Sequence, residues 1–475
     1  MGKLLILGID GMDPDVIETL IDDLPIVREL IEHNCFTRLN STFPPDSIPA
    51  WVSIYTGENP IVHGWLDNID YEEIKKGRSP FQLNEFQGKT FWDKASKSGK
   101  RVCIINPFLA YPVWPVNGVM INGPVFINGE ISCYPPELKE EYQFPQLGGM
   151  TDFPDEKELF NFGSKTIITT KQIADFALDL YKKDNWDLFF VSFFTVDRMQ
   201  HFLWRYFDKN DPTYPGENNL SQYIPDLYRT IDSIIADFVE SMGPTDSLLI
   251  LSDHGHGMRP LKQININEVL RLEKYLFPLD EKKKFQLRKY IEKTKNLFLE
   301  WLSDHKLESI SYVIGKLLPK KVRRDLKKSS YLIDKVKSKG WVSDFGGGTS
   351  MGGVEINPQI KLEKPELYKK IREDLILNLS ELKDGSGKKV VKWIRSSGND
   401  VCEKYPDLIF ELEDQFAVGR TLFSGVISKN PRHIKISGGH KPQGVLFYKS
   451  NIPLNVEANK SVLNIHDLVI KTLEG

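Results

Sequence analysis

Long apolar runs are missing from this sequence of 475 residues. No stretch of about 18 or more uncharged apolar residues occurs, and a transmembrane helix needs a run of that length. The N-terminal stretch MGKLLILGIDGMD also lacks the small-residue cleavage site of a secretory signal. We therefore expect no membrane-spanning helix and no signal peptide, and we interpret the first apolar run as a β-strand that begins a folded domain.

Cysteine is scarce and has no recognisable spacing. No two of the four cysteines form a C-x-x-C pair or show the spacing of a zinc finger. They are Cys35, Cys103, Cys133 and Cys402. Because Cys35 and Cys103 lie in apolar stretches, buried free thiols in a reducing compartment are a better interpretation than disulfides. The cysteines and the missing signal together predict a cytoplasmic location.

The sequence also has no large excess of positive or negative charge. The 62 Lys and Arg residues and the 65 Asp and Glu residues leave a net charge of −3, which excludes a globally basic nucleic-acid-binding protein. The hydrophobic fraction of 40% is too high for a disordered chain. The length indicates two or three domains, or one large α/β core with insertions.

Short apolar runs alternate with helical patterns along the chain. The runs expected to form buried parallel strands are Leu4–Ile9, Val102–Ile105, Leu188–Phe194, Leu248–Leu251 and Leu408–Phe410. Helices are expected at Asp15–Leu30 and Lys171–Tyr181, with Asp13 as N-cap of the first and Pro25 as its end or kink. The alternation predicts an α/β fold with a mainly parallel central sheet flanked by helices. In such sheets, the active site lies at the carboxyl ends of the strands.

Residues 271–340 differ in composition from the rest of the chain. They include 20 Lys and Arg against 9 Asp and Glu, a net charge of +11 in an otherwise acidic sequence. We interpret this segment as a basic helical insertion, and residues 1–270 and 341–475 as the core. The insertion is either a solvated helical face, or a cap over a site, or a docking element for an anionic substrate or a membrane surface.

Aspartate and histidine gather near the ends of the predicted strands and in a glycine-rich segment near the C-terminus. The six residues are Asp10, Asp197, His201, Asp253, His254 and His440. Asp197 and His201 are four residues apart, so one helical turn places both on the same face. Such mixed oxygen and nitrogen ligands suit Zn²⁺, Mn²⁺ or Fe better than Mg²⁺ or Ca²⁺. Each residue alone could be an N-cap or a polar surface residue, but the joint pattern predicts a site with enough ligands for two ions.

A serine follows the proline-rich turn of the segment TFPPDSIPAWVSIYTGENPIVHGWLDN, residues 42–68. Ser47 precedes a helix expected at Ala50–Tyr55, where the positive end of the helix dipole favours a phosphate. A bound metal would lower the pKa of the Ser47 hydroxyl and replace the general base of a serine hydrolase. Two alternatives stay open: Ser47 is only a helix N-cap, or it belongs to a Ser-His-Asp triad, although no G-x-S-x-G elbow surrounds it.

The order of these motifs resembles the alkaline phosphatase superfamily, and within it the type I phosphodiesterase/nucleotide pyrophosphatase family. GIDGMD comes first, then the serine turn with a TG-x-x-P-x-x-HG tail, then D-x-x-x-H, SDHG and a late GGH. The resemblance extends from Asp10 to a C-terminal helix expected at Asp467–Leu473. It implies an alkaline-phosphatase-like catalytic core, whereas the helical insertion is inferred only from the composition of residues 271–340.

The resemblance also implies which residues bind metal. One ion would be held by Asp197, His201 and His440. The other ion would be held by Asp10, Asp253 and His254. Two divalent cations are therefore expected as cofactors, with Zn²⁺ most favoured and Mn²⁺ second.

The remaining implied roles concern the serine turn. Ser47 stands nine residues before Thr56 and matches the nucleophile, and Asn68 matches a residue that contacts the phosphate. Thr42 is a second, less favoured candidate nucleophile because its spacing to Thr56 is 14 residues. His256 is an additional histidine beside SDHG, and we expect it at the surface or behind a ligand rather than as a ligand.

The resemblance implies a metal-dependent phosphodiesterase that forms a phospho-Ser intermediate on a small phosphodiester or nucleotide-like substrate. A phosphomonoesterase with the same site is one alternative. A polyanion-binding or membrane-surface protein with a vestigial site is another. A sulfatase is disfavoured because Trp51 stands where that family needs Arg. Trp51 and other aromatic residues near the site either stack on a base or belong to the core.

Overall fold

The computed structural model describes residues 2–66, 87–123, 130–141, 144–145, 154–279, 294, 298, 301, 333–343, 349–398, 405–430, 433, 436–452 and 460–474. The chain forms two compact units. The first unit consists of Met1–Met258 and Ser437–Gly475, and the second of Arg259–Ile436. Among the described helices, none combines the length and the apolar character that a membrane span requires.

The first unit is built around an eight-stranded sheet with the strand order β2-β17-β7-β1-β6-β3-β4-β5. Its strands are β1 (Leu4–Ile9), β2 (Phe36–Asn40), β3 (Val102–Ile105), β4 (Gly118–Asn122), β5 (Ser132–Tyr134), β6 (Leu188–Phe193), β7 (Ser247–Leu251) and β17 (Gln443–Lys449). The five strands from β7 to β4 are parallel to one another, whereas β17 and β5 are antiparallel to their neighbours. The predicted mainly parallel sheet is therefore confirmed.

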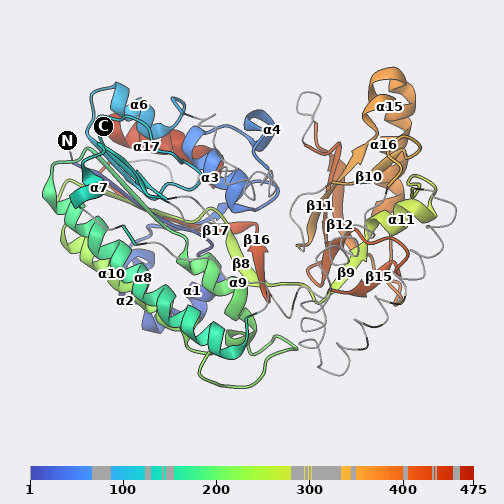
Figure 1. Cartoon of the computed structure of the whole chain (residues 1–475), viewed down its shortest axis with the longest axis horizontal. Helices are drawn as coiled ribbons and strands as arrows, with labels where there is room; N and C mark the ends of the chain where they lie inside the picture. The colour runs from blue at the N-terminus through green and yellow to red at the C-terminus, as the bar shows by residue number, and fades with distance from the viewer. Residues whose placement is uncertain are drawn as a thin grey trace. The chain divides into compact units, whose positions relative to one another are not determined.

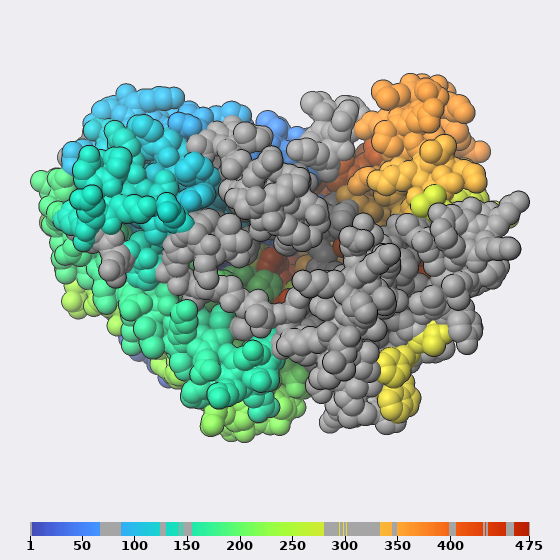
Figure 2. All heavy atoms as spheres, in the orientation of Figure 1, coloured from blue at the N-terminus to red at the C-terminus, as the bar shows by residue number. Residues whose placement is uncertain are grey.

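Helices cover both faces of this sheet (Figure 1). One face carries α1 (Pro14–Leu20), α2 (Pro25–Glu32), α8 (Glu156–Lys183), α9 (Thr195–Phe207) and α10 (Tyr223–Glu240). The other carries α3 (Ser47–Thr56), α6 (Phe91–Lys97) and α17 (Ile465–Glu474). Alternate residues of β1 enter the two cores, since Leu5 and Leu7 pack with the first group and Leu4 and Ile6 with the second. The outer side of α8, coloured teal, lies at the surface of this unit (Figure 2).

The first predicted helix is divided in the structure. Helix α1 is followed by a 3₁₀ turn, η1 (Ile21–Asp23), and α2 then begins at Pro25. Proline lacks an N–H and suits the first turn of a helix, so the break at Pro25 was predictable. The Asp13 carboxylate accepts hydrogen bonds from the backbone N–H groups of Asp15 and Val16, which confirms Asp13 as the N-cap.

The described residues of the first unit also form shorter elements. They are α4 (Pro60–His63), α7 (Leu138–Glu141), the 3₁₀ turn η3 (Val462–Asn464) and the two-stranded sheet of β8 (Gly255–Met258) and β16 (Gly438–Lys441). Strands β8 and β16 are antiparallel and place His440 opposite His256. This small sheet brings the end of the chain beside the segment that follows β7.

The described residues of the second unit form two sheets with a hydrophobic core of their own. Four strands have the order β10-β11-β13-β12, and three have the order β14-β9-β15. Their bounds are β9 (Lys262–Asn265), β10 (Gly340–Val342), β11 (Met351–Ile356), β12 (Val391–Ser396), β13 (Leu408–Leu412), β14 (Phe416–Gly419) and β15 (Ile427–Lys429). The described helices are α11 (Ile266–Leu272), α15 (Pro358–Glu363) and α16 (Pro365–Ser380).

Two expectations change with this second unit. The run Leu408–Phe410 was expected in the parallel sheet, but it belongs to β13, which is antiparallel to both of its neighbours. Residues 341–436, expected in the catalytic core, instead belong to the second unit because β10–β15 and α16 bury their apolar faces against one another. Most of the predicted insertion 271–340 lies outside the described residues, so its helical character stays a prediction.

Candidate active site

Three neighbouring strands end at one edge of the sheet and place acidic residues there. The register pairs Ile9 with Phe193 and Gly8 with Leu251, so β1, β6 and β7 end at the same level. Asp10 follows β1, Asp197 lies in the first turn of α9 after β6, and Asp253 follows β7. All three residues are buried: Asp10 is 2% exposed, Asp197 is 8% exposed and Asp253 is 0% exposed.

Hydrogen bonds from backbone N–H groups connect these strand ends. The Asp197 N–H donates to the Asp10 carbonyl at 3.0 Å, and the Gly11 N–H donates to Asp253 Oδ1 at 3.2 Å. Gly11 has a φ of +69°, and a Cβ atom there would lie 2.8 Å from Cβ of Asp197. The glycine of the GIDG motif is therefore required both by its backbone conformation and by the close approach of Asp197.

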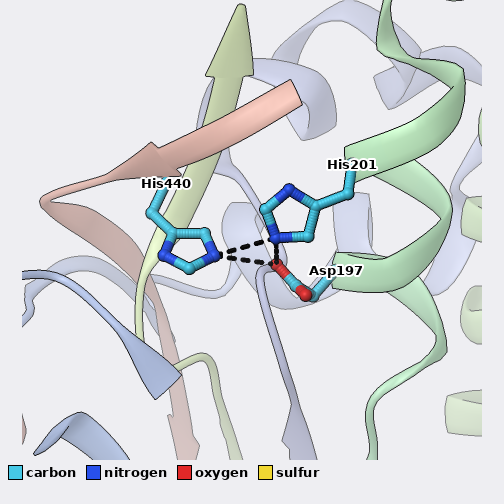
Figure 3. A group of neighbouring side chains, drawn as sticks. All are labelled: Asp197, His201 and His440. Carbon is cyan, nitrogen blue, oxygen red and sulfur yellow. Dashed lines mark hydrogen bonds and ion pairs between the residues drawn. The ribbon is translucent and has the colours of Figure 1, made fainter. Parts of the chain in front are cut away.

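His201 and His440 converge on Asp197 from two different elements, α9 and β16 (Figure 3). Asp197 Oδ1 lies 3.3 Å from Nε2 of His201 and 3.5 Å from Nε2 of His440. The two Nε2 atoms are 3.0 Å apart. These three side chains form a group whose ligand atoms lie within 4.8 Å of one another.

A second group consists of Asp10, Asp253 and His254. His254 Nε2 lies 3.3 Å from Asp253 Oδ2 and 3.7 Å from Asp10 Oδ1, and all three residues are buried. The structure thus gathers the six predicted ligands into two groups. The two groups have the same membership as the two predicted ligand sets.

Ser47 is the first residue of α3, and its side chain points at the second group. Its Oγ lies 3.2 Å from Asp10 Oδ1 and 3.1 Å from His254 Nε2. The interpretation of Ser47 as a mere N-cap is wrong, because Asp46 is the N-cap and accepts from the Ile48 N–H at 3.1 Å.

The other predicted residues of this segment have different surroundings. The Thr42 hydroxyl donates to the Pro44 carbonyl at 2.8 Å, within its own turn. The Trp51 indole is buried, and its Nε1 donates to Asp10 Oδ2 at 2.8 Å, so it packs behind the site and is not available to stack on a base. Asn68 lies outside the described residues.

His256 was not predicted to be part of the site. We expected it at the surface or behind a ligand, and the first of these is wrong because the residue is fully buried. Its Nδ1 lies 3.3 Å from Asp197 Oδ1, and its ring centroid is 4.6 Å from that of His201. It also forms a third possible ligand group with Asp197 and His254. The signal was the i, i+2 spacing of the histidines in SDHGHG, since alternate residues of an extended segment share one side.

The acidic residues strongly perturb one another's pKa values. Burial, and then the neighbouring Asp253 and Asp197 carboxylates, raise the pKa of Asp10 well above its usual value. Burial followed by Asp197 likewise raises the pKa of Asp253. Burial would also raise the pKa of Asp197, but His201, His256 and His440 outweigh it and hold that pKa well below the usual range. Three carboxylates at such short range need positive charge between them to ionise together.

The imidazoles have the arrangement of metal ligands. Burial and then His440 lower the pKa of His254 well below its usual value, which favours the neutral ring that coordinates a cation. His201 Nδ1 lies 3.1 Å from the Gly438 carbonyl, and His254 Nδ1 lies 3.0 Å from the Gly255 carbonyl. Carbonyls accept from N–H, so each Nδ1 is the donor and each Nε2 faces the carboxylates with a lone pair.

Two buried carboxylate oxygens are a further indication of a metal site. Asp197 Oδ1 and Asp253 Oδ2 accept no hydrogen bond from the described residues. A buried carboxylate oxygen without a hydrogen-bond donor is costly unless a cation lies beside it. The oxygens, the oriented imidazoles and the clustered carboxylates fit divalent metal ions.

Comparison with known proteins identifies the family. The family model described as type I phosphodiesterase / nucleotide pyrophosphatase matches residues 4–419. The chain belongs to this family. Membership makes it a phosphodiesterase/pyrophosphatase-type hydrolase of the alkaline phosphatase superfamily, as the sequence predicted. A comparison with curated protein sequences finds no significant match.

Solved structures of phosphonoacetate hydrolase have a similar fold. Phosphonoacetate hydrolase from Sinorhizobium meliloti in complex with phosphonoformate has a TM-score of 0.54 and 11% identity, covering 99% of this chain and 96% of that one. Its complex with phosphonoacetate has a TM-score of 0.52 with the same identity and coverage. Human ectonucleotide pyrophosphatase / phosphodiesterase 5 has a TM-score of 0.49 and 10% identity, covering 99% and 95%. At these identities, the likeness to phosphonoacetate hydrolase concerns the fold, and it confirms the alkaline-phosphatase-like architecture.

Proposed function

We propose that this chain hydrolyses phosphodiesters with Ser47 as the nucleophile and two divalent cations as cofactors. The observation that carries the proposal is the position of Ser47 Oγ, 3.2 Å from Asp10 Oδ1 and 3.1 Å from His254 Nε2. Both residues belong to one candidate ligand group, so a cation held there would lie beside the hydroxyl. The N-terminal end of α3 adds a positive dipole at the same point.

The proposed ligands of one cation are Asp10, Asp253 and His254, and those of the other are Asp197, His201 and His440. Zn²⁺ is the preferred ion and Mn²⁺ the second choice, because the ligands combine carboxylate oxygen with imidazole nitrogen. When bound, the two cations supply Lewis-acid chemistry that favours the Ser47 alkoxide and neutralises charge on the phosphoryl oxygens.

The proposed reaction proceeds in two displacements at phosphorus. Ser47 Oγ loses its proton to solvent and attacks phosphorus, the bond from phosphorus to the leaving oxygen breaks, and the leaving group takes a proton from water. Water then attacks the phosphorus of phospho-Ser47. The bond from Oγ to phosphorus breaks, the Ser47 hydroxyl regains a proton, and the phosphate monoester departs. Asn68 is proposed to bind a non-bridging oxygen.

The proposed substrate is a small phosphodiester or a nucleotide-like molecule. A phosphomonoesterase would use the same nucleophile and ligands, and it is the alternative that the assay below separates. The cytoplasmic location also stays a proposal, supported by the free cysteines Cys35, Cys103 and Cys133. A peripheral contact of residues 271–340 with anionic surfaces stays a proposal as well, supported by their charge of +11.

The test compares hydrolysis of bis-p-nitrophenyl phosphate and p-nitrophenyl phosphate by the full chain. The protein is first treated with a chelator, and Zn²⁺ or Mn²⁺ is then restored. We expect activity that returns with metal and prefers the diester. We expect Ser47→Ala to lose nearly all turnover while it keeps its bound metal. A preference for the monoester would change the class of substrate, and normal turnover by Ser47→Ala would show that another residue is the nucleophile.

A further inference from the structure

The three histidines proposed as ligands differ in what their second ring nitrogen faces. Nδ1 of His201 and Nδ1 of His254 each face a backbone carbonyl. Nδ1 of His440 instead faces a carboxylate, since it lies 3.6 Å from Oδ2 of Asp46. His440 therefore lies between two carboxylates, with Nε2 toward Asp197 and Nδ1 toward Asp46.

Asp46 occupies a position that serves two elements at once. As the N-cap of α3, it has an extended backbone and accepts the Ile48 N–H with Oδ1 at 3.1 Å. Its own N–H donates to the Pro44 carbonyl at 3.0 Å, and its carbonyl accepts from Ala50 at 3.1 Å. The backbone of Asp46 is thus fixed on both sides, and Oδ2 is directed at His440.

We infer that Asp46 is a positioning residue that orients His440 toward the metal and links this ligand to the helix of Ser47. The inference rests on the proposed function, in which His440 binds a cation. A carboxylate near Nδ1 favours a proton on that nitrogen, which leaves the lone pair on Nε2 and makes Nε2 a better ligand. Because Ser47 is the next residue, one side chain sets both the start of the nucleophile helix and the direction of a ligand on β16.

The chemistry of N-caps separates this role from a purely structural one. Ser and Asn cap helices about as well as Asp, so either of them maintains α3 at Asp46. Ser is too short to reach His440, and Asn lacks the negative charge. A cap alone therefore predicts no change in metal binding for Asp46→Ser or Asp46→Asn, whereas the orienting role predicts a loss in both.

The matched control is Asp155→Ser. Asp155 is the N-cap of α8, accepts from the Glu158 N–H at 2.8 Å, and begins a helix on the opposite face of the sheet from α3. This variant measures what the exchange of Asp for Ser at an N-cap does to the thermal midpoint. It should leave metal binding and turnover unchanged.

The experiment titrates the metal-free full-length variants with Zn²⁺ in competition with a chelating dye, and records the absorption spectrum of the Co²⁺-loaded proteins. We expect Asp46→Asn and Asp46→Ser to bind one of the two ions about 10- to 100-fold more weakly, the usual effect of removing such a partner. We expect the Co²⁺ spectrum to change because the ligand direction changes. Wild-type affinities and spectra in both variants would overturn the inference.

His440→Ala, measured in parallel, separates this inference from the proposed function. If His440→Ala loses an ion and the Asp46 variants do not, only the role of Asp46 is wrong. If His440→Ala binds both ions like the wild type, the ligand set itself is wrong and the inference fails with it. Because two variants retain the cap, a folding defect in one leaves the other to decide.

Discussion

The hydrogen bond from Trp51 to Asp10 allows a sharp test of how the site is organised. Trp51 Nε1 donates to Asp10 Oδ2 at 2.8 Å, and the indole is fully buried. The other oxygen of Asp10 faces Ser47 and His254. We infer that the indole holds one carboxylate oxygen so that the other is directed at the proposed ion.

The perturbation is Trp51→Phe, which keeps an aromatic ring and removes the donor. Removing the donor leaves a buried Asp10 oxygen without its partner, which costs roughly 1–3 kcal/mol, and we expect a loss of about that size in the free energy of unfolding of the metal-free protein. Because Asp10 also loses its orientation, we expect metal affinity to fall about 10- to 100-fold. Urea denaturation measures the first quantity, and competition with a chelating dye measures the second.

Trp114→Phe is the matched control. Trp114 is also buried, and its Nε1 donates to Asp93 Oδ1 at 2.8 Å, outside both candidate ligand groups. Its replacement removes the same type of bond and a similar volume, so it should cost a comparable amount of stability and leave metal affinity unchanged. If both variants lose stability equally and Trp51→Phe still binds metal like the wild type, the orienting role of the indole is refuted.

Two further predictions concern the surroundings of Asp197. His256→Leu removes the imidazole whose Nδ1 lies 3.3 Å from Asp197 Oδ1, and it should weaken metal binding about 10-fold. His256→Asn keeps a polar nitrogen near Asp197 and should bind metal nearly normally. Equal affinities of the two variants in a dye competition would contradict this prediction. Gly11→Ala forces a Cβ to within 2.8 Å of Asp197 and should lower both the free energy of unfolding and metal affinity. Gly64 also has a positive φ, +72°, but a Cβ added there would have no atom within 4 Å. For Gly64→Ala we therefore expect only the cost of the left-handed backbone, about 1–2 kcal/mol in the free energy of unfolding. Equal losses of stability and affinity in the two glycine variants would contradict the steric explanation.

The strand ends of the first unit could be predicted from the sequence because each signal is local. An apolar run followed by Asp10 or Asp253 identifies both a buried strand and the polar group at its end. Asp197 and His201 were assigned to one helical face from their spacing alone, and both lie on α9. Parallel strands aligned in register then bring these groups together.

Contacts between distant segments could not be predicted in the same way. The position of His256 depends on the pairing of β8 with β16, in which His440 lies opposite His256, 184 positions away in the sequence. The interaction of Asp46 with His440 depends on the same pairing. The direction of β13 could not be predicted either, because a short apolar run such as Leu408–Phe410 has the same pattern in parallel and antiparallel sheets. The change in charge at residue 271 did not locate the boundary between the units, because the second unit already begins at Arg259.

The place where the second unit enters the chain explains how His440 reaches the site. The first unit is interrupted after Met258 and resumes at Ser437, and β8 and β16 on either side of the interruption pair with Met258 opposite Gly438. Within the second unit, the two ends are also held together, because Asn430 donates to the Pro260 carbonyl at 2.8 Å.

An insertion whose ends are adjacent can vary in length and content with little effect on the sheet that carries it, since the entropy of closing a loop rises only slowly with its length. The register of β16 on β8 sets the position of His440 whatever lies between them. The sequence of the second unit can therefore vary without moving a proposed metal ligand. The β8–β16 pair, by contrast, cannot shift by one residue without turning His440 away from Asp197.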